Sequence, residues 1–132
     1  MNKYLGLLIA FVTLILGITS CAKDSIHDAP SIKGEWTWVY SIGGDVGELF
    51  TPENTMKTER LVIDNSRFQK YVNDSLDLDI NYVLNSIQTS TTTEITVMEF
   101  SYGEQLVVEI SATELILTEQ CIHCFFHKYR RH

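Results

Sequence analysis

The sequence has few basic side chains. Ten Lys and Arg residues stand against 17 Asp and Glu residues in a chain of 132, and the formal net charge is -7. Proteins that bind nucleic acid use clusters of Lys and Arg to neutralise the phosphates. Because this chain is acidic and has no basic stripe long enough to neutralise a phosphate backbone, we expect it not to bind DNA or RNA.

Proline and the common catalytic motifs are equally scarce. The two prolines, Pro30 and Pro52, both lie between segments with strand-like spacing, as pairing of strands requires. No Gly-x-Ser-x-Gly elbow, phosphate-binding glycine loop or His-Glu-x-x-His zinc motif occurs. We therefore expect a non-enzymatic protein with no catalytic residues, no cofactor and no resident metal.

The chain contains one long apolar run, from Tyr4 to Ile18, preceded by the positive charge of Lys3. A membrane-spanning helix needs roughly 20 apolar residues, so this run is too short to cross a bilayer comfortably. A positive start, a short apolar run and small residues at its end are typical of secretory signal peptides. We expect residues 1–20 to be such a peptide and to be removed.

The segment Ile18-Thr19-Ser20-Cys21 resembles the lipobox of bacterial lipoproteins. The resemblance implies that the Cys21 thiol carries a diacylglycerol and that lipid chains on this residue anchor the protein to the outer membrane, facing either the periplasm or the cell surface. The alternative is an ordinary signal peptide followed by an unmodified cysteine. Residues 21–31 are polar and have no periodicity, so we expect them to form a flexible tether.

From Gly34 onward, apolar residues recur at every second position. The clearest run is formed by Leu76, Leu78, Ile80, Tyr82 and Leu84. This spacing is typical of β-strands that bury one face. Eight such segments, separated by turn-forming residues, predict an all-β domain over residues 32–132. We expect an eight-stranded antiparallel up-and-down barrel, which also leaves no exposed sheet edge.

A barrel of this size is filled by side chains or holds one small ligand. From the alternation of inward-facing and outward-facing residues, we expect four aromatic side chains to point into the barrel and to contact a small apolar or aromatic ligand. They are Trp38, Tyr40, Phe68 and Tyr82. The long connection over residues 42–57 either frames the open end of this site or simply closes the barrel. The alternative function is that of a structural or accessory envelope protein, with a filled barrel and protein partners that the sequence does not identify.

The segment Gly34-Glu35-Trp36 resembles the Gly-x-Trp signature of the lipocalins. Together with Thr51-Pro52 and the ending Cys-aromatic-Tyr-Arg, it is similar to the small lipocalin-like lipoproteins of Bacteroidetes. The resemblance implies a calycin-type barrel in which Trp36 plugs the closed end. It also implies that a basic residue near the end of the last strand packs over this indole, and we assign that role to Arg130, with Arg131 as the alternative.

Two further cysteines, Cys121 and Cys124, lie near the end of the chain beside His123 and His127. In a regular strand their side chains would point to opposite faces, so a disulfide between them requires a turn. We expect this disulfide, which suits an oxidising compartment. Unbonded packing is an alternative, as is a metal or redox site made from these four residues, although their spacing matches no recognised zinc module.

Overall fold

The computed structural model describes residues 29–90 and 93–132, so the expected signal peptide and Cys21 lie outside the described part of the chain. Nine strands and one helical turn are present there. Their bounds are β1 (Gly34–Gly43), β2 (Glu48–Phe50), α2 (Pro52–Thr55), β3 (Glu59–Ile63), β4 (Arg67–Val72), β5 (Ser75–Gln88), β6 (Glu94–Phe100), β7 (Gln105–Ile110), β8 (Glu114–Glu119) and β9 (Phe126–Arg131). Within the described residues, no helix has the length and apolar character needed to cross a bilayer.

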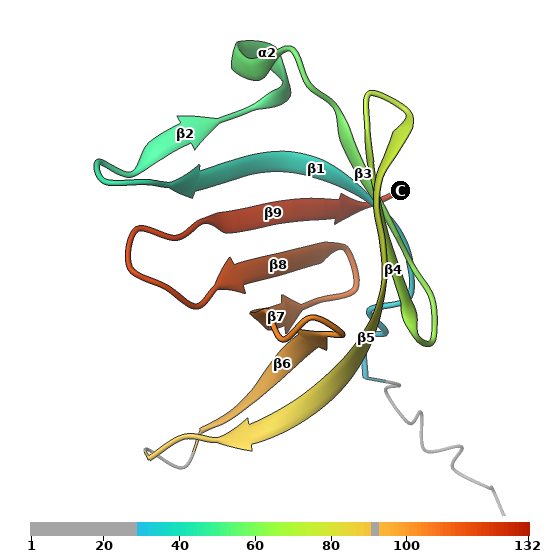
Figure 1. Cartoon of the computed structure of the whole chain (residues 1–132), viewed down its shortest axis with the longest axis vertical. Coiled ribbons are helices and arrows are strands. Elements are labelled where there is room, and N and C mark those ends of the chain that lie inside the picture. Colours follow the sequence, from blue (N-terminus) through green and yellow to red (C-terminus); the bar gives the residue numbers. More distant parts are fainter. Residues whose placement is uncertain (1–28, 91–92) are drawn as a thin grey trace, which may run out of the picture.

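The strands form one antiparallel sheet that closes on itself. Each strand from β3 to β9 pairs with the next, and β1 pairs with β3 on one edge and with β9 on the other. Figure 1 shows β1, β9 and β8 side by side along one wall, with β3, β4 and β5 around the opposite side. This eight-stranded antiparallel barrel confirms the fold predicted from the alternating residues, and it is consistent with a calycin-like architecture. The short strand β2 is an addition, because it pairs only with the last three residues of β1.

The alternation of facing is broken in β1. The pairing with β9 shifts by one residue between Trp38 and Tyr40, which is a β-bulge. Trp38 is buried before the bulge, and after it Ser41 is the buried residue. Tyr40 therefore lies on the outer face, where its ring stacks on Phe126 at a centroid distance of 6.2 Å. This corrects the expectation that Tyr40 lines the interior, since one extra residue reverses the facing of every residue that follows.

Strand β5 is long enough to serve two neighbours. Its first half pairs with β4 and its second half, from Tyr82, pairs with β6. In Figure 1 it curves from the upper right of the barrel to the lower left. The run of alternating apolar residues is buried only near the middle of this strand, because Leu76 and Leu84 near its ends are 53% and 44% exposed.

One end of the barrel is closed around Trp36, which is 0% exposed. Its Nε1 donates to the carbonyl of Ile32 at 2.8 Å, so the chain before β1 crosses beneath the indole. The Arg131 guanidinium lies 4.1 Å from the centre of the Trp36 ring. Arg131 also donates to the carbonyls of Ser31, Lys33 and Ala112 at 2.7, 3.0 and 2.9 Å. These contacts tie the first and last described segments together.

The basic residue over the indole is thus Arg131 and not Arg130. Arg131 is directly opposite Trp36 in the ladder and shares its face, whereas Arg130 is opposite Thr37 and is exposed. Gly34 is required beside this contact, because its φ is +130° and a Cβ there would lie 2.9 Å from Arg131 Nη1. The glycine of the Gly-x-Trp segment therefore makes room for the arginine.

Candidate functional site

A cavity of about 290 Å³ lies at the end of the barrel opposite Trp36 and is open to solvent. We call it the cup. It is bounded by β1, β2, β9, the start of β3 and the connection that contains α2. Its lining consists of the aromatic residues Trp38, Phe50 and Phe125 and the polar residues Ser41, Thr55, Lys57, Glu59 and His127.

The aromatic wall of the cup is built on the barrel rather than on loose loops. Trp38 comes from β1 and is 5% exposed. Phe50 ends β2 and packs against the core, and its ring centre lies 5.8 Å from that of Phe125. Phe125 covers Gly43, where a Cβ would lie only 2.5 Å from the phenyl ring. Glycine at position 43 is therefore needed for Phe125 to reach the cup.

A chain of hydrogen bonds forms the polar floor of the cup. Trp38 Nε1 donates to Ser41 Oγ at 2.8 Å, and Ser41 Oγ lies 2.7 Å from His127 Nδ1. His127 Nε2 lies 3.3 Å from Glu119 Oε1. Because a carboxylate only accepts, the Nε2 hydrogen points to Glu119, and in the neutral imidazole Nδ1 then accepts the Ser41 hydroxyl hydrogen. Ser41 is 6% exposed, and this network satisfies its buried oxygen.

The connection that contains α2 frames the cup. Thr51 and Asn54 form a reciprocal capping box: Thr51 N–H donates to Asn54 Oδ1 at 2.8 Å and Asn54 N–H donates to Thr51 Oγ1 at 3.3 Å. Pro52 follows the cap at the first helical position, where a missing N–H costs nothing. The Asn54 side chain also donates to the carbonyl of Leu49 at 2.8 Å. The long connection is thus ordered locally, and it carries Thr55 and Lys57 to the cup.

Both signs of charge stand at the rim of the cup. Lys57 and Glu59 line it, and among the described residues neither forms an ion pair. The two opposite charges leave the rim without a strong excess of either sign.

The predicted aromatic wall is only partly brought together. Trp38 lines the cup. Phe68 is 4% exposed and packs edge-on against Phe100, with ring centres 5.0 Å apart, so it belongs to the core. Tyr82 lies at a different cavity, and Tyr40 lies on the outer face.

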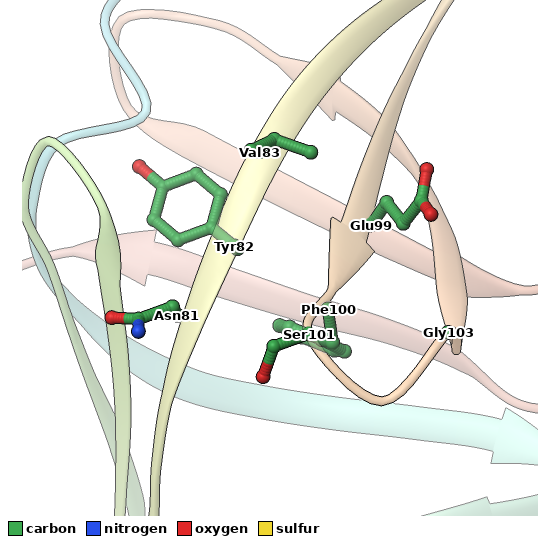
Figure 2. Close-up of a pocket in the computed structure, with 7 residues that line it drawn as sticks. All are labelled: Asn81, Tyr82, Val83, Glu99, Phe100, Ser101 and Gly103. Carbon is green, nitrogen blue, oxygen red and sulfur yellow. The ribbon is translucent and has the colours of Figure 1, made fainter.

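The cavity beside Tyr82 measures about 250 Å³ and lies where β5 changes partner from β4 to β6. Its lining includes Asn81, Val83, Glu99 and Ser101 (Figure 2). The Tyr82 hydroxyl is directed away from Glu99 and donates to the carbonyl of Asp64 at 2.5 Å. Burial raises the pKa of Tyr82, which keeps this hydroxyl protonated as a donor. The tyrosine thus braces the turn between β3 and β4.

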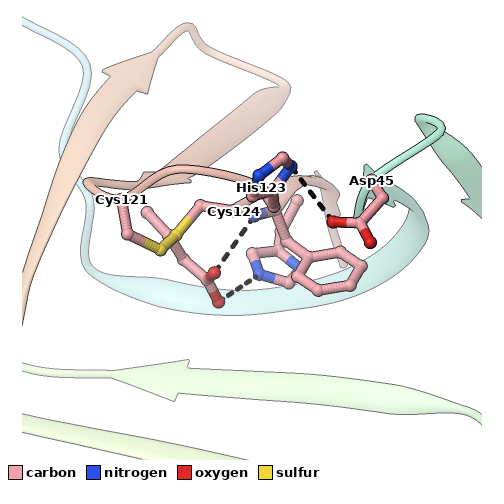
Figure 3. The surroundings of a disulfide bond; sticks show 7 residues. Asp45, Cys121, His123 and Cys124 are labelled. Atoms are coloured by element: carbon pink, nitrogen blue, oxygen red, sulfur yellow. Dashed lines mark hydrogen bonds and ion pairs between the residues drawn. A yellow bond between two sulfur atoms is a disulfide. The ribbon is translucent and has the colours of Figure 1, made fainter.

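A disulfide joins Cys121 and Cys124, whose Cα atoms are 5.2 Å apart, in the turn between β8 and β9. His123, between them, has a left-handed backbone with φ of 67°. The turn reaches the loop after β1, because His123 Nδ1 lies 3.1 Å from Asp45 Oδ1 and the Gly44 N–H donates to the His123 carbonyl at 3.2 Å (Figure 3). The predicted disulfide is present, in the turn that the spacing required.

Several cup residues were not predicted from the sequence as ligand-site residues. Ser41 faces inward only because of the bulge, and Phe50, Thr55 and Lys57 lie in the long connection. Glu119, which does not line the cup but supports His127, was not predicted either, because it belongs to a strand with ordinary alternation. The aromatic pair Phe125-Phe126, at the entry to β9, was the one available signal, because alternation that extends from the strand turns one of the two rings inward.

No family model matches the chain, and no curated protein or solved structure shows significant similarity to it.

Proposed function

We propose that this protein is a membrane-anchored, lipocalin-like lipoprotein that binds a small apolar or aromatic ligand in the cup and catalyses no reaction. The observation that carries the proposal is the aromatic-lined cavity of about 290 Å³ at the open end of a closed barrel. This volume is just below the usual range of ligand sites, about 300–1,000 Å³. The cup therefore suits a compact molecule.

The composition of the cup favours an aromatic ligand. Trp38, Phe50 and Phe125 offer ring faces and edges against which another ring packs with a favourable geometry. The hydroxyl of Ser41 and the imidazole of His127 are already paired with each other. A ligand therefore gains mainly by burying apolar surface, with Thr55 and Lys57 available at the rim for a polar substituent.

The Ser41–His127–Glu119 chain has the residue types of a hydrolytic triad, but its geometry favours a structural role. The Ser41 oxygen accepts the Trp38 indole hydrogen, and this bond reduces the electron density that a nucleophile needs. Ser41 is also 6% exposed, so a substrate carbonyl has little room to approach its oxygen. We interpret the chain as the network that holds Trp38 and His127 in place.

An anchor on Cys21 would leave the cup accessible. Ser31, Ile32 and Lys33 are fixed at the closed end by Arg131 and Trp36. A tether that ends there joins the barrel at its closed end, which leaves the cup at the opposite end uncovered. The mass of the protein extracted from membranes tests the anchor: we expect the added mass of lipid on Cys21, and none in a Cys21→Ser variant.

Binding to the cup is tested with N-phenyl-1-naphthylamine, an uncharged aromatic probe whose fluorescence increases in apolar surroundings. Phe125 and Phe126 provide a matched pair of variants, because they are adjacent aromatic residues in the same segment. Phe125 lines the cup and Phe126 stacks on Tyr40 at the outer face. We expect Phe125→Ala to weaken probe binding by about tenfold or more and Phe126→Ala to leave it unchanged.

Equal probe affinities for the two variants would overturn the assignment of the cup. The absence of any binding to the unmodified protein would favour the second candidate, an accessory envelope protein. That candidate is supported by the dense interior, in which Trp36, Leu61, Met98 and Leu115 are each 0% exposed. In the accessory role, the barrel is a filled scaffold that acts through protein contacts.

A further inference from the structure

We propose that the turn between β8 and β9 is a redox-controlled metal site. When the Cys121–Cys124 disulfide is reduced, the two thiolates and the Glu119 carboxylate bind one zinc-like divalent cation. The two cysteines lie outside the lining of the cup, and Glu119 links the two regions because it also ends the hydrogen-bond chain of the cup floor. The inference does not depend on the proposed ligand.

Three donors of the right chemistry converge at this turn. One ligand atom from each of Glu119, Cys121 and Cys124 lies within 4.8 Å of the other two. Zinc binds thiolate sulfur at about 2.3 Å and carboxylate oxygen at about 2.0–2.2 Å in a tetrahedral arrangement. The two sulfurs are bonded to each other in the oxidised form, so after reduction they must move apart to share one ion with the carboxylate that lies beside them. Two cysteines three positions apart in a turn are also well placed to chelate it.

The carboxylate is oriented before any metal arrives. Glu119 Oε2 accepts the Phe125 N–H at 3.0 Å, and Glu119 Oε1 lies 3.3 Å from His127 Nε2. Groups that hold a ligand side chain in this way tune metal affinity strongly. His127 is itself fixed by Ser41 at 2.7 Å. Figure 3 shows the disulfide beside the His123–Asp45 pair, which ties the turn to the loop after β1.

A metal ion can reach the site from solvent. Cys121 is exposed, and a surface cavity of about 460 Å³ is lined by Cys121, Glu119 and Glu104. The acidic side chains along this cavity attract cations, and the overall charge of -7 has the same effect. The side of the site that faces the cavity leaves room for water as a fourth ligand, which a three-residue zinc site requires.

The chemical step is a thiol–disulfide exchange with a dithiol reductant. One reductant thiolate attacks a sulfur of the Cys121–Cys124 bond, the second thiol resolves the mixed disulfide, and the reductant leaves as a cyclic disulfide. Two electrons pass to the protein, and two thiols form. Binding of the cation then displaces the two thiol protons, which are released to solvent.

The test is a titration of the purified protein with Co²⁺, in parallel on the oxidised form and on the form reduced with a phosphine that does not bind metal. We expect the reduced form to bind one Co²⁺ per chain with thiolate-to-cobalt charge-transfer absorption, which Zn²⁺ then abolishes by displacement. We expect the oxidised form to show no such absorption. We expect Glu119→Gln to weaken the affinity of the reduced form by about tenfold or more.

Glu114→Gln is the matched control, because Glu114 lies at the other end of the same strand and pairs with Lys128. We expect this variant to bind Co²⁺ like the unmodified protein. Absence of the charge-transfer absorption from the reduced protein would overturn the proposal. Equal metal affinity of the Glu119→Gln variant and the unmodified protein would also overturn it, because the dithiol alone would then account for binding.

If reduction of the disulfide partly unfolds the protein, circular dichroism of the reduced chain with and without Zn²⁺ provides a second test. A reduced chain that loses its β-sheet spectrum and regains it with one equivalent of Zn²⁺ supports the site, and a spectrum that Zn²⁺ does not restore overturns it. Probe binding to the oxidised protein is measured in the same preparation. Failure of the metal site therefore leaves the result on the cup unaffected, and failure of the cup leaves the metal result unaffected.

Discussion

The two ends of the barrel are built around two tryptophans that are two residues apart on the same strand. Trp36 is 0% exposed, donates to the backbone carbonyl of Ile32 and is covered by Arg131. Trp38 is 5% exposed, donates to the side chain of Ser41 and forms part of a cavity wall. The same residue type, on the same face, thus closes one end of the barrel and lines a cavity at the other.

The difference lies in what satisfies each indole. At the closed end the Trp36 indole donates to the backbone carbonyl of Ile32, and the covering Arg131 donates to three further backbone carbonyls. Backbone atoms do not move unless the fold changes. At the open end, the partner is a hydroxyl in a chain of side chains that ends at Glu119. A binding site needs such a support, because side chains adjust to a ligand without disturbing the strands. If the cup binds a ligand as proposed, the closed end contributes stability and the open end contributes binding.

The largest expected effect comes from Trp36→Ala. Removal of a fully buried indole leaves a cavity, and we expect the free energy of unfolding to fall by about 3–5 kcal/mol, as measured by urea denaturation. Trp38→Ala should cost clearly less, because that side chain already borders a solvent-open cavity and water fills the space. Equal losses for the two variants would mean that the two ends do not differ in the way described here.

Arg131→Ala should have the next largest effect. This variant loses three hydrogen bonds to backbone carbonyls and the contact with the Trp36 ring, and we expect a loss of about 2 kcal/mol in thermal or urea unfolding. Arg130→Ala is the matched control, because the exposed neighbour has the same charge. We expect it to change stability by no more than about 0.5 kcal/mol. A larger loss of stability from Arg130→Ala than from Arg131→Ala would mean that Arg131 is not the residue that closes this end of the barrel.

Ser41→Ala probes the open end. It leaves the Trp38 indole and His127 Nδ1 without their partner, and we expect a loss of about 1–2 kcal/mol, because a buried polar group without a hydrogen bond is costly. Ser41→Ala should also weaken binding of N-phenyl-1-naphthylamine, whereas Arg131→Ala should not. Unchanged binding after Ser41→Ala would show that the hydrogen-bond chain does not organise the cup.

The smallest effect is a pH dependence in the turn between β3 and β4. Asp64 accepts N–H bonds from Ser66 and Arg67 at 3.0 and 2.9 Å, and these bonds hold its pKa below the usual 3.8. A carboxyl whose pKa is lower in the folded state stabilises the protein above its unfolded pKa, and this contribution is lost as the pH falls through the folded pKa. We expect Asp64→Asn to lower the melting temperature at neutral pH.

The difference between the Asp64→Asn variant and the unmodified protein should shrink as the pH is lowered below about 3.8 and should vanish once Asp64 is protonated in both states. Melting temperatures of the two proteins across this range provide the measurement. A difference that stays constant from neutral to acidic pH would contradict the account of this turn.

The architecture was predictable because alternation is a local property. Each segment reports which of its residues face the core, and eight such segments admit few closed arrangements. The role of Trp36 was predicted from the resemblance of Gly34-Glu35-Trp36 to the lipocalin signature, and the disulfide turn was predicted from the spacing of Cys121 and Cys124. The choice between Arg130 and Arg131 depended on the register between β1 and β9, which one sequence does not specify.

The cup was less predictable, for two physical reasons. No residue type in the sequence marks the bulge between Trp38 and Tyr40, but the bulge turns Tyr40 outward and Ser41 inward. Phe50 and Lys57 reach the cup through a connection whose path depends on the Thr51–Asn54 cap and the pairing of β2. Side chains that meet through a bulge and an irregular connection are set by tertiary structure, not by periodicity.

The most direct test of the account uses the indole N–H resonances of the two tryptophans, assigned with Trp36→Phe and followed by nitrogen–proton NMR during titration with N-phenyl-1-naphthylamine. A bound aromatic ring shifts the resonances of groups that it contacts. We predict that the Trp38 indole resonance moves with saturation while the Trp36 resonance stays in place. Movement of the Trp36 resonance alone, or of neither, would contradict the assignment of one end of the barrel to stability and the other to binding.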